Sequence, residues 1–376
     1  MNQLGSESPH ASPSSAPKRG EGSAVSIAVD AMGGDHGPEV LVEGALTAAR
    51  ERQIKIILVG QAEEIQSHLK ANQHSQVDVV DAADVVGMHE PAVTPVRRKP
   101  ESSVRVAAEL VRAGKADGLV TAGHTGAAMI TAKVVIGMVP GVDRPALATV
   151  FPNRAHGRTV LLDVGANVDV KPAQLREFAI MGHVYAQELL GLADPRVGLL
   201  AIGEEESKGN HRHRQGYEVL QNTGLNFTGN VEGHAVFDGS VDVVVCDGFV
   251  GNAILKAAES IAETIGGMLR EEFEVGWRTK AGFAIARPAV RRMRERLDYR
   301  RYGGAPFLGV RGACFVAHGR SNATAIHNTV LQAAEFCRGD IAGRMERGIA
   351  ALHREEDRMA EQGERLAVSG RGGNEE

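Results

Sequence analysis

The residues best suited to chemistry follow an apolar run near position 245. Residues 242–256 read DVVVCDGFVGNAILK, so Asp247, Gly251, Asn252 and Lys256 come directly after a segment typical of a buried strand. This pattern predicts a strand that ends in a polar turn, with a helix beginning at that turn. Open α/β sheets bind ligands where strands end and helices begin, so we expect a binding site here.

The same pattern recurs along the chain. An apolar segment, a Gly-rich polar turn and a predicted helix follow one another at residues 25–38, 116–129, 160–172, 197–210 and 315–326. The carboxyl ends of parallel strands lie along one edge of a sheet, so we expect these turns to meet at one active site.

Two of these turns have the composition of phosphate sites. Free amides and the dipole at a helix N-terminus bind anions. One turn contains Gly33, Gly34 and Asp35, and the other contains Gly126 beside Thr125, whose hydroxyl suits a phosphate oxygen. Phosphate is therefore the favoured ligand. The alternative is that these glycines only form tight turns, for which glycine is the default residue.

Three chargeable side chains lie inside the predicted turns. Lys208 follows three glutamates, Lys171 follows the sequence GANVDV, and His318 lies in AHGRSN at the end of an apolar strand. Each is placed to neutralise an anion at a strand's carboxyl end. The alternative is that the lysines are solvated and that His318 is a hydrogen-bonded turn residue.

Several well-known catalytic motifs are absent. The chain has no GxxxxGK[ST], GxSxG, HExxH or CxxC sequence, which disfavours P-loop hydrolysis, serine-hydrolase chemistry and zinc sites. His211 and His213 are two residues apart, so they diverge on a helix and make a poor metal site. We expect neither a metal nor a cofactor.

Composition limits the class of protein. A chain of 376 residues with 43% hydrophobic content can bury a substantial core, in one large or two modest domains. The net charge of −5 disfavours a general nucleic-acid binder. Cys246, Cys314 and Cys337 are far apart, which fits a reducing compartment such as the cytoplasm. No apolar stretch reaches the roughly 18 residues of a spanning helix, and we expect no secretion signal.

The elements that position these residues alternate between strand and helix. Apolar strands at 25–30 and 54–60 each precede a helical pattern, and their unbroken Val, Ile and Leu content predicts a sheet covered on both faces. We therefore predict a three-layer α/β/α sandwich with a mostly parallel sheet. Residues 25–340 form the predicted α/β domain, after a Ser-, Pro- and Gly-rich disordered tail at 1–24 and before a charged helix and tail at 341–376.

Residues 251–302 interrupt this alternation with two helical patterns and no strand between them, which predicts a protruding helical hairpin. Its turn region contains Phe273, Trp277 and Phe283, followed by an Arg-rich stretch at 287–301. An apolar tip with cationic flanks suits contact with an anionic membrane surface. Packing against the same arm of a second subunit is the other interpretation.

Eight motifs occur in a fixed order between about residues 25 and 340. They are IAVDAMGGDHGP, TAGHTGAAM, LLDVGANVDVKP, GEEESKGN, NVEGH, VVVCDGFVGNAILK, YGGAPFLGVRG and AHGRSNATAI. In this order they resemble the bacterial PlsX family, the acyl-acyl carrier protein:phosphate acyltransferases. The resemblance implies transfer of a fatty acyl group from acyl carrier protein to inorganic phosphate, giving acyl phosphate for phospholipid synthesis. It also implies a fold similar to the phosphotransacetylases and the isocitrate and isopropylmalate dehydrogenases.

The resemblance further implies partners and a location. It implies a homodimer formed through the projecting arm, peripheral contact with the inner face of the cell membrane, and a downstream glycerol-phosphate acyltransferase. The carrier protein is acidic, so the stretch at 287–301 is a candidate docking site for it as well as for a membrane.

For this reaction no covalent enzyme intermediate is needed, because the thiolate leaves readily and phosphate is already anionic. We expect Lys208 to neutralise the phosphate or the developing oxyanion, and Asn252 to donate a hydrogen bond to the thioester carbonyl. The expected phosphate ligands are Thr125, Gly126, His318 and Ser321, with Gly33, Gly34, Asp35, Asn167, Lys171 and Asp247 lining the site. Cys246 is expected to be a core residue rather than a nucleophile.

Other classes of protein are less favoured. A phosphotransacetylase-like enzyme would use coenzyme A, and an NAD-dependent dehydrogenase of similar fold would use a nucleotide. A non-catalytic scaffold would bind the membrane and the carrier protein through the arm.

Overall fold

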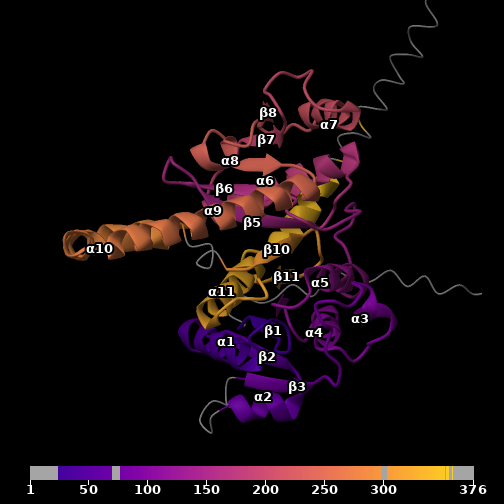
Figure 1. Ribbon diagram of the computed structural model, residues 1–376. Coiled ribbons are helices and arrows are strands. Elements are labelled where there is room, and N and C mark those ends of the chain that lie inside the picture. Colours follow the sequence, from indigo (N-terminus) through magenta and orange to yellow (C-terminus); the bar gives the residue numbers. More distant parts are fainter. Residues whose placement is uncertain (1–23, 70–76, 298–302, 352, 355–357, 359–376) are drawn as a thin grey trace, which may run out of the picture.

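The computed structural model describes residues 24–69, 77–297, 303–351, 353, 354 and 358 (Figure 1). The predicted disordered tail at 1–24 lies outside these residues except for Ala24, and so do positions 298–302 of the predicted arm.

One continuous sheet runs through the body (Figure 1). Its eleven strands have the order β3-β2-β1-β4-β11-β10-β5-β6-β9-β7-β8. The strands are β1 Ser26–Asp30, β2 Lys55–Gly60, β3 Val77–Asp81, β4 Gly118–Thr121, β5 Ala146–Pro152, β6 Arg158–Leu162, β7 Val197–Leu200, β8 Phe227–Val231, β9 Val243–Val245, β10 Ala305–Leu308 and β11 Ala313–Val316. Pairing is parallel except that β10 is antiparallel to both β11 and β5, and β5 is antiparallel to β6. The predicted, mostly parallel sheet is confirmed.

Helices cover both faces of the sheet (Figure 1). The helices are α1 Pro38–Arg52, α2 Ala62–His68, α3 Thr94–Arg97, α4 Ser103–Arg112, α5 Thr125–Thr131, α6 Pro172–Leu190, α7 His211–Gln221, α8 Ala235–Asp238, α9 Gly248–Glu274, α10 Trp277–Leu297 and α11 Ala323–Arg338. One hydrophobic cluster includes residues of α1, α6 and α11, and the other includes residues of α4, α5 and α8. This is the predicted three-layer arrangement.

Unbroken apolar strands are possible because alternate side chains enter different clusters. In β1, Ile27 and Val29 belong to the cluster under α1 and α11, whereas Ala28 belongs to the cluster under α4. All five residues of β1 are buried. Side chains of successive strand residues point to opposite faces, so a strand covered on both sides needs apolar residues at every position.

The arm begins with the helix that follows strand β9. Helix α9 begins after β9, and its first turn is buried through Gly248 and Gly251. A Cβ atom on Gly251 would lie 1.8 Å from the carbonyl oxygen of Asp163, so only glycine lets the helix approach so closely. Beyond this turn α9 and α10 project from the body as the predicted hairpin (Figure 1), and the tilted rings of Phe273 and Phe283 pack with their centroids 4.7 Å apart near its turn.

The chain continues in a helix over residues 341–351. Ile341, Met345 and Ile349 are buried in the same cluster as α6 and α11, and Arg344 forms an ion pair with Glu188 of α6. The described part of this helix therefore packs on the body, while the predicted boundary at residue 340 stays a prediction.

We expect Gly251→Ala to lower the free energy of unfolding by about 2 kcal/mol, because the new methyl group collides with the Asp163 carbonyl. Gly266→Ala is the control, since Gly266 lies in the same helix with nothing within 4 Å of its would-be Cβ. Removing that glycine should stabilise the helix by up to about 1 kcal/mol. Urea unfolding measures both values, and equal midpoints for the two variants would contradict this account of the close approach.

Candidate active site

A cavity opens where two neighbouring strands diverge. Strand β10 pairs with β5 only through Phe307 with Leu147 and Leu308 with Ala146, although β5 continues to Pro152. Beyond these pairs, residues 148–152 line one side of a cavity of about 380 Å³, and residues 303–306 line the other. The site is therefore a cleft between strands β5 and β10.

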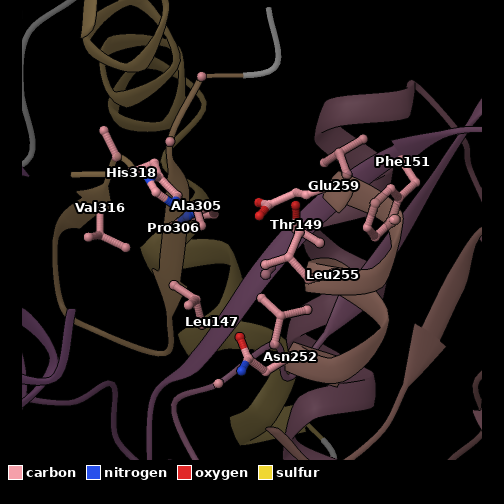
Figure 2. A pocket seen from close by; sticks show the side chains of 18 of the residues that line it. Leu147, Thr149, Phe151, Asn252, Leu255, Glu259, Ala305, Pro306, Val316 and His318 are labelled. Carbon is pink, nitrogen blue, oxygen red and sulfur yellow. The ribbon is translucent and has the colours of Figure 1, made fainter. Parts of the chain in front are cut away.

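Polar groups from three turns meet in this cavity. Thr125 is the first residue of α5, Asn252 lies in the first turns of α9, and His318 and Ser321 lie between β11 and α11. Figure 2 shows His318 across the cavity from Asn252 and Glu259. The structure thus brings together four residues that the sequence predicts as ligands or catalytic groups.

The other residues predicted in the glycine-rich turns hold these turns together. The backbone N–H of Asp35 donates to the carbonyl of Gly319 at 2.8 Å, and a Cβ on Gly33 would lie 2.6 Å from the amide nitrogen of Gly123. Gly34 packs against the same Gly319 carbonyl. These residues shape the wall behind His318 and Thr125, with Gly126 following Thr125 in α5.

Two buried aspartates organise the turns, and sequence reasoning missed both. Asp163 accepts hydrogen bonds from the backbone N–H groups of Leu147 and Ala166, each at 3.0 Å, and from the side chain of Asn167 at 2.9 Å. Burial raises the pKa of Asp163, against the opposing effect of these donors. Asp30 accepts from the Thr121 hydroxyl at 2.7 Å, and burial likewise raises its pKa. Both follow an apolar run in the sequence, and an Asp in that position could have identified them.

Several predicted site residues lie elsewhere. Asn167 and Lys171 line a separate hollow together with Arg144 and Arg212. Asp247 caps α9 by accepting from the backbone N–H of Val250 at 2.9 Å, and it lines a further hollow beside Arg212. In the part of the chain that the structure describes, none of Asn167, Lys171 and Asp247 borders the cavity that contains Asn252.

Lys208 also lies away from this cavity. It belongs to the turn after β7, and its amine is 3.8 Å from a carboxylate oxygen of Glu205. Among the described residues that border the cavity, Lys208 is not present. The side chain is 45% exposed and its ion pair is long, so little free energy holds it in this position.

Lys256 and Glu259 line the cavity. The sequence placed Lys256 at the expected binding site but gave it no role, and it did not single out Glu259. The Lys256 amine lies 2.9 Å from the Glu259 carboxylate. With Asn252 they occupy positions i, i+4 and i+7 of α9, which place all three on one side of the helix. That spacing was the signal that could have identified them.

His318 is the titratable group whose electrostatics are best defined. Its Nδ1 accepts from the backbone N–H of Arg320 at 3.1 Å, so in the neutral ring Nε2 carries the proton and is a donor. Burial lowers the pKa of His318, and the nearby positive charge of Lys256 lowers it further. His318 is therefore an uncharged hydrogen-bond donor at neutral pH.

Cys246 is not a nucleophile of this site. It is 4% exposed, and its thiol donates to the carbonyl oxygen of Asp163 at 3.4 Å. Burial raises its pKa well above the ordinary value, so the reactive thiolate is suppressed. The predicted core position is confirmed.

Within the described residues, no group of three or more His, Cys, Asp or Glu side chains is arranged to hold a metal ion. None of the helices in those residues is both long and apolar enough to cross a membrane.

The fold matches solved phosphotransacetylases. The enzyme from Streptococcus pyogenes superposes with a TM-score of 0.59 at 17% identity, over 85% of this chain and 95% of that chain. The EutD phosphotransacetylase from Staphylococcus aureus gives a TM-score of 0.55 at 17% identity, over 84% and 94% of the two chains. The architecture is thus that of the phosphotransacetylase fold, as predicted.

Sequence similarity identifies the family within this fold. Residues 25–344 match the family described as fatty acid synthesis protein. The phosphate acyltransferase of Pelobacter propionicus is 46% identical over 345 residues, which cover 90% of this chain and 99% of that protein. That of Koribacter versatilis is 49% identical over 335 residues, covering 87% and 93%. The chain therefore belongs to the fatty acid synthesis protein family, the PlsX family whose motifs it resembles.

We expect the imidazole of His318 to titrate below its ordinary pKa of 6.5, because burial and Lys256 both disfavour the charged ring. Lys256→Met should raise this pKa, since it removes a neighbouring positive charge. Lys280→Met is the control, because Lys280 is exposed on the arm. NMR titration of the histidine Cε1–H signals, with His318→Asn for assignment, measures the shift. An unchanged pKa in Lys256→Met would show that the lysine does not act on His318.

Proposed function

We propose that this protein transfers a fatty acyl group from the thioester of acyl carrier protein to inorganic phosphate and so forms an acyl phosphate. Membership of the PlsX family, with phosphate acyltransferases of 46% to 49% identity, is the observation that carries this proposal. The cavity supports it, because polar groups suited to phosphate border the same space as apolar groups suited to a fatty chain. Phospholipid synthesis uses the product, with a glycerol-phosphate acyltransferase as the next enzyme.

The reaction needs positioning and charge stabilisation more than activated side chains. A phosphate oxygen attacks the thioester carbonyl carbon, the carbonyl oxygen becomes an oxyanion, and the C–S bond then breaks to release the thiolate of the carrier protein. Both reactants are activated already, so orientation and stabilisation of the oxyanion supply the acceleration.

Phosphate binds at the polar end of the cavity. Thr125 and Ser321 offer hydroxyls, and His318 offers an Nε2–H without adding a charge. Lys256 supplies a positive charge beside them, held in place by Glu259. Gly33, Gly34, Asp35 and Gly126 act indirectly by shaping the turns.

Asn252 and Lys208 act on the thioester. Asn252 projects from the anchored first turns of α9 and donates to the carbonyl oxygen as it becomes an oxyanion. We assign Lys208, which lies outside the cavity in the turn after β7, to the same charge, because its long contact with Glu205 is weak enough to be exchanged. Asn167 and Asp247 are positioning residues, and Lys171 serves an anionic part of the acyl donor in its own hollow.

A second candidate is acyl transfer between coenzyme A and phosphate. The likeness to phosphotransacetylases, at 17% identity, supports a common fold but does not indicate which thioester donates the acyl group. The choice of thioester in the assay separates the two functions, whereas inactivity with both thioesters would favour a dehydrogenase or a scaffold.

The arm has two further proposed roles. Ile261, Ile265 and Met268 of α9 are exposed at positions i, i+4 and i+7, which form one apolar side of the helix suited to a second subunit. Trp277 at the tip is 76% exposed and lies beside Arg278, a combination suited to the cytoplasmic surface of the membrane. Phe273 and Phe283 pack on each other and support the tip from inside.

We expect purified protein, palmitoyl-acyl carrier protein and phosphate to give hydroxylamine-trappable acyl phosphate and free thiol in equal amounts. Asn252→Ala should lower kcat about 100-fold or more with little change in KM, because its contact strengthens only in the transition state. Lys208→Ala should also lower kcat, whereas the exposed Asn222→Ala is the control. Thiol release without acyl phosphate would indicate a thioesterase and overturn the proposed function.

For the arm, we expect Ile265→Glu to convert a dimer to a monomer without changing the tip, since it places a charge in the apolar side of α9. Trp277→Ala should weaken binding to anionic vesicles several-fold while the dimer persists, because the tip loses its largest exposed aromatic side chain. Light scattering and vesicle flotation measure the two properties. Each variant is the control for the other, and loss of both properties in either variant would contradict separate roles.

A further inference from the structure

Helix α9 lines the cavity with two adjacent sides, one polar and one apolar. Asn252, Lys256 and Glu259 form a polar side that faces His318, as Figure 2 shows for Asn252 and Glu259. Leu255 and Ala258, followed by Ala262, line the cavity at positions i, i+3 and i+7, which places them on an adjacent side of the helix. The same helix therefore borders a polar space and an apolar space.

Strand β5 forms the opposite wall of the apolar space. Leu147 and Phe151 belong to the cluster that also packs against Leu255 and Ala258, so the odd-numbered residues of β5 face α9. Thr149 lies between them on the same side, and Figure 2 shows Phe151 and Thr149 beside Leu255. We call the space between this wall and the apolar side of α9 the apolar channel.

An aromatic pair, Phe151 and Phe237, also lines this cavity. The ring of Phe151 meets the ring of Phe237 edge to face at 5.2 Å. Phe151 is 9% exposed, whereas Phe237 in the short helix α8 is 37% exposed, so Phe237 is the member of the pair that borders both the cavity and solvent. Phe237 is fixed through its backbone, since its N–H donates to His234 and its carbonyl accepts from Arg154.

We propose that the apolar channel holds the acyl chain, and that Phe237, packed on Phe151, sets the longest chain that the enzyme accepts. This inference rests on the proposed function. The thioester carbonyl lies near Asn252 at one end, and the chain extends along β5 toward Phe237. Each methylene that enters the channel leaves water and stabilises the complex, until the terminal methyl group meets the aromatic pair.

The diverging strands explain why a chain fits here. Because β10 leaves β5 after two residue pairs, the cavity follows the direction of β5 from Leu147 to Pro152. That is the shape of an extended alkyl group rather than of a compact ligand. The polar side of α9 meanwhile keeps phosphate on the other side of the thioester carbon.

The test replaces one of two neighbouring alanines by leucine and compares how kcat/KM depends on the length of the acyl chain. Ala258→Leu adds bulk inside the channel and should lower kcat/KM for palmitoyl-acyl carrier protein about 10-fold or more relative to the octanoyl thioester. Ala257→Leu is the matched control, because Ala257 is exposed and does not border the cavity. Its ratio of palmitoyl to octanoyl kcat/KM should equal that of the unmodified protein.

Phe237→Ala provides the opposite change. Opening the end of the channel should increase kcat/KM for chains longer than palmitoyl, taken as a ratio to kcat/KM for octanoyl, by about 5-fold or more. If the unmodified protein forms acyl phosphate but neither variant shifts the profile relative to Ala257→Leu, the proposed channel is wrong and the proposed function stands. If no acyl thioester yields acyl phosphate, the proposed function itself fails.

Discussion

The site depends on the contact between the first turn of α9 and the turn after β6. Gly251 lies so close to the Asp163 carbonyl that no side chain fits between them, and Gly248 is similarly close to the backbone of Asn167. The Asp163 carboxylate, in turn, binds the amides of its own turn and of Leu147 in β5. Asp163 therefore connects β5 through its carboxylate and α9 through its backbone carbonyl, and a buried acceptor with several donors has few alternative arrangements.

Charge in the cavity is balanced within a small space. Lys256 is matched by Glu259, and His318 remains neutral because its ring is half-buried beside Lys256. The groups that a phosphate anion would meet here under the proposed function are one paired cation and several neutral donors rather than an excess of positive charge. Under the proposed function, this balance would let the site bind the anion without holding it so tightly that attack on the thioester is slowed, which is the condition for selective stabilisation of the transition state.

Local patterns in the sequence predicted much of the fold. Apolar runs followed by Gly-rich turns identify strand ends such as those before Thr125, Asn252 and His318, because a strand's exit and a helix's start depend on nearby residues. The divergence of β5 from β10 could not be predicted, since it depends on pairing between segments far apart in the sequence. Asp163 was overlooked for the same reason: its donors come both from its own turn, at Ala166 and Asn167, and from the more distant Leu147 of β5.

The arm joins the site to a distant part of the molecule. Helix α9 runs without a break for 27 residues, and Asn252 lies in its second turn while Trp277 follows its end. At 1.5 Å per residue, Asn252 and the last residue of α9 are about 33 Å apart along a single rigid rod. One continuous helix therefore connects the outer end of the arm, next to Trp277, with Asn252 and with the Gly251 contact at Asp163.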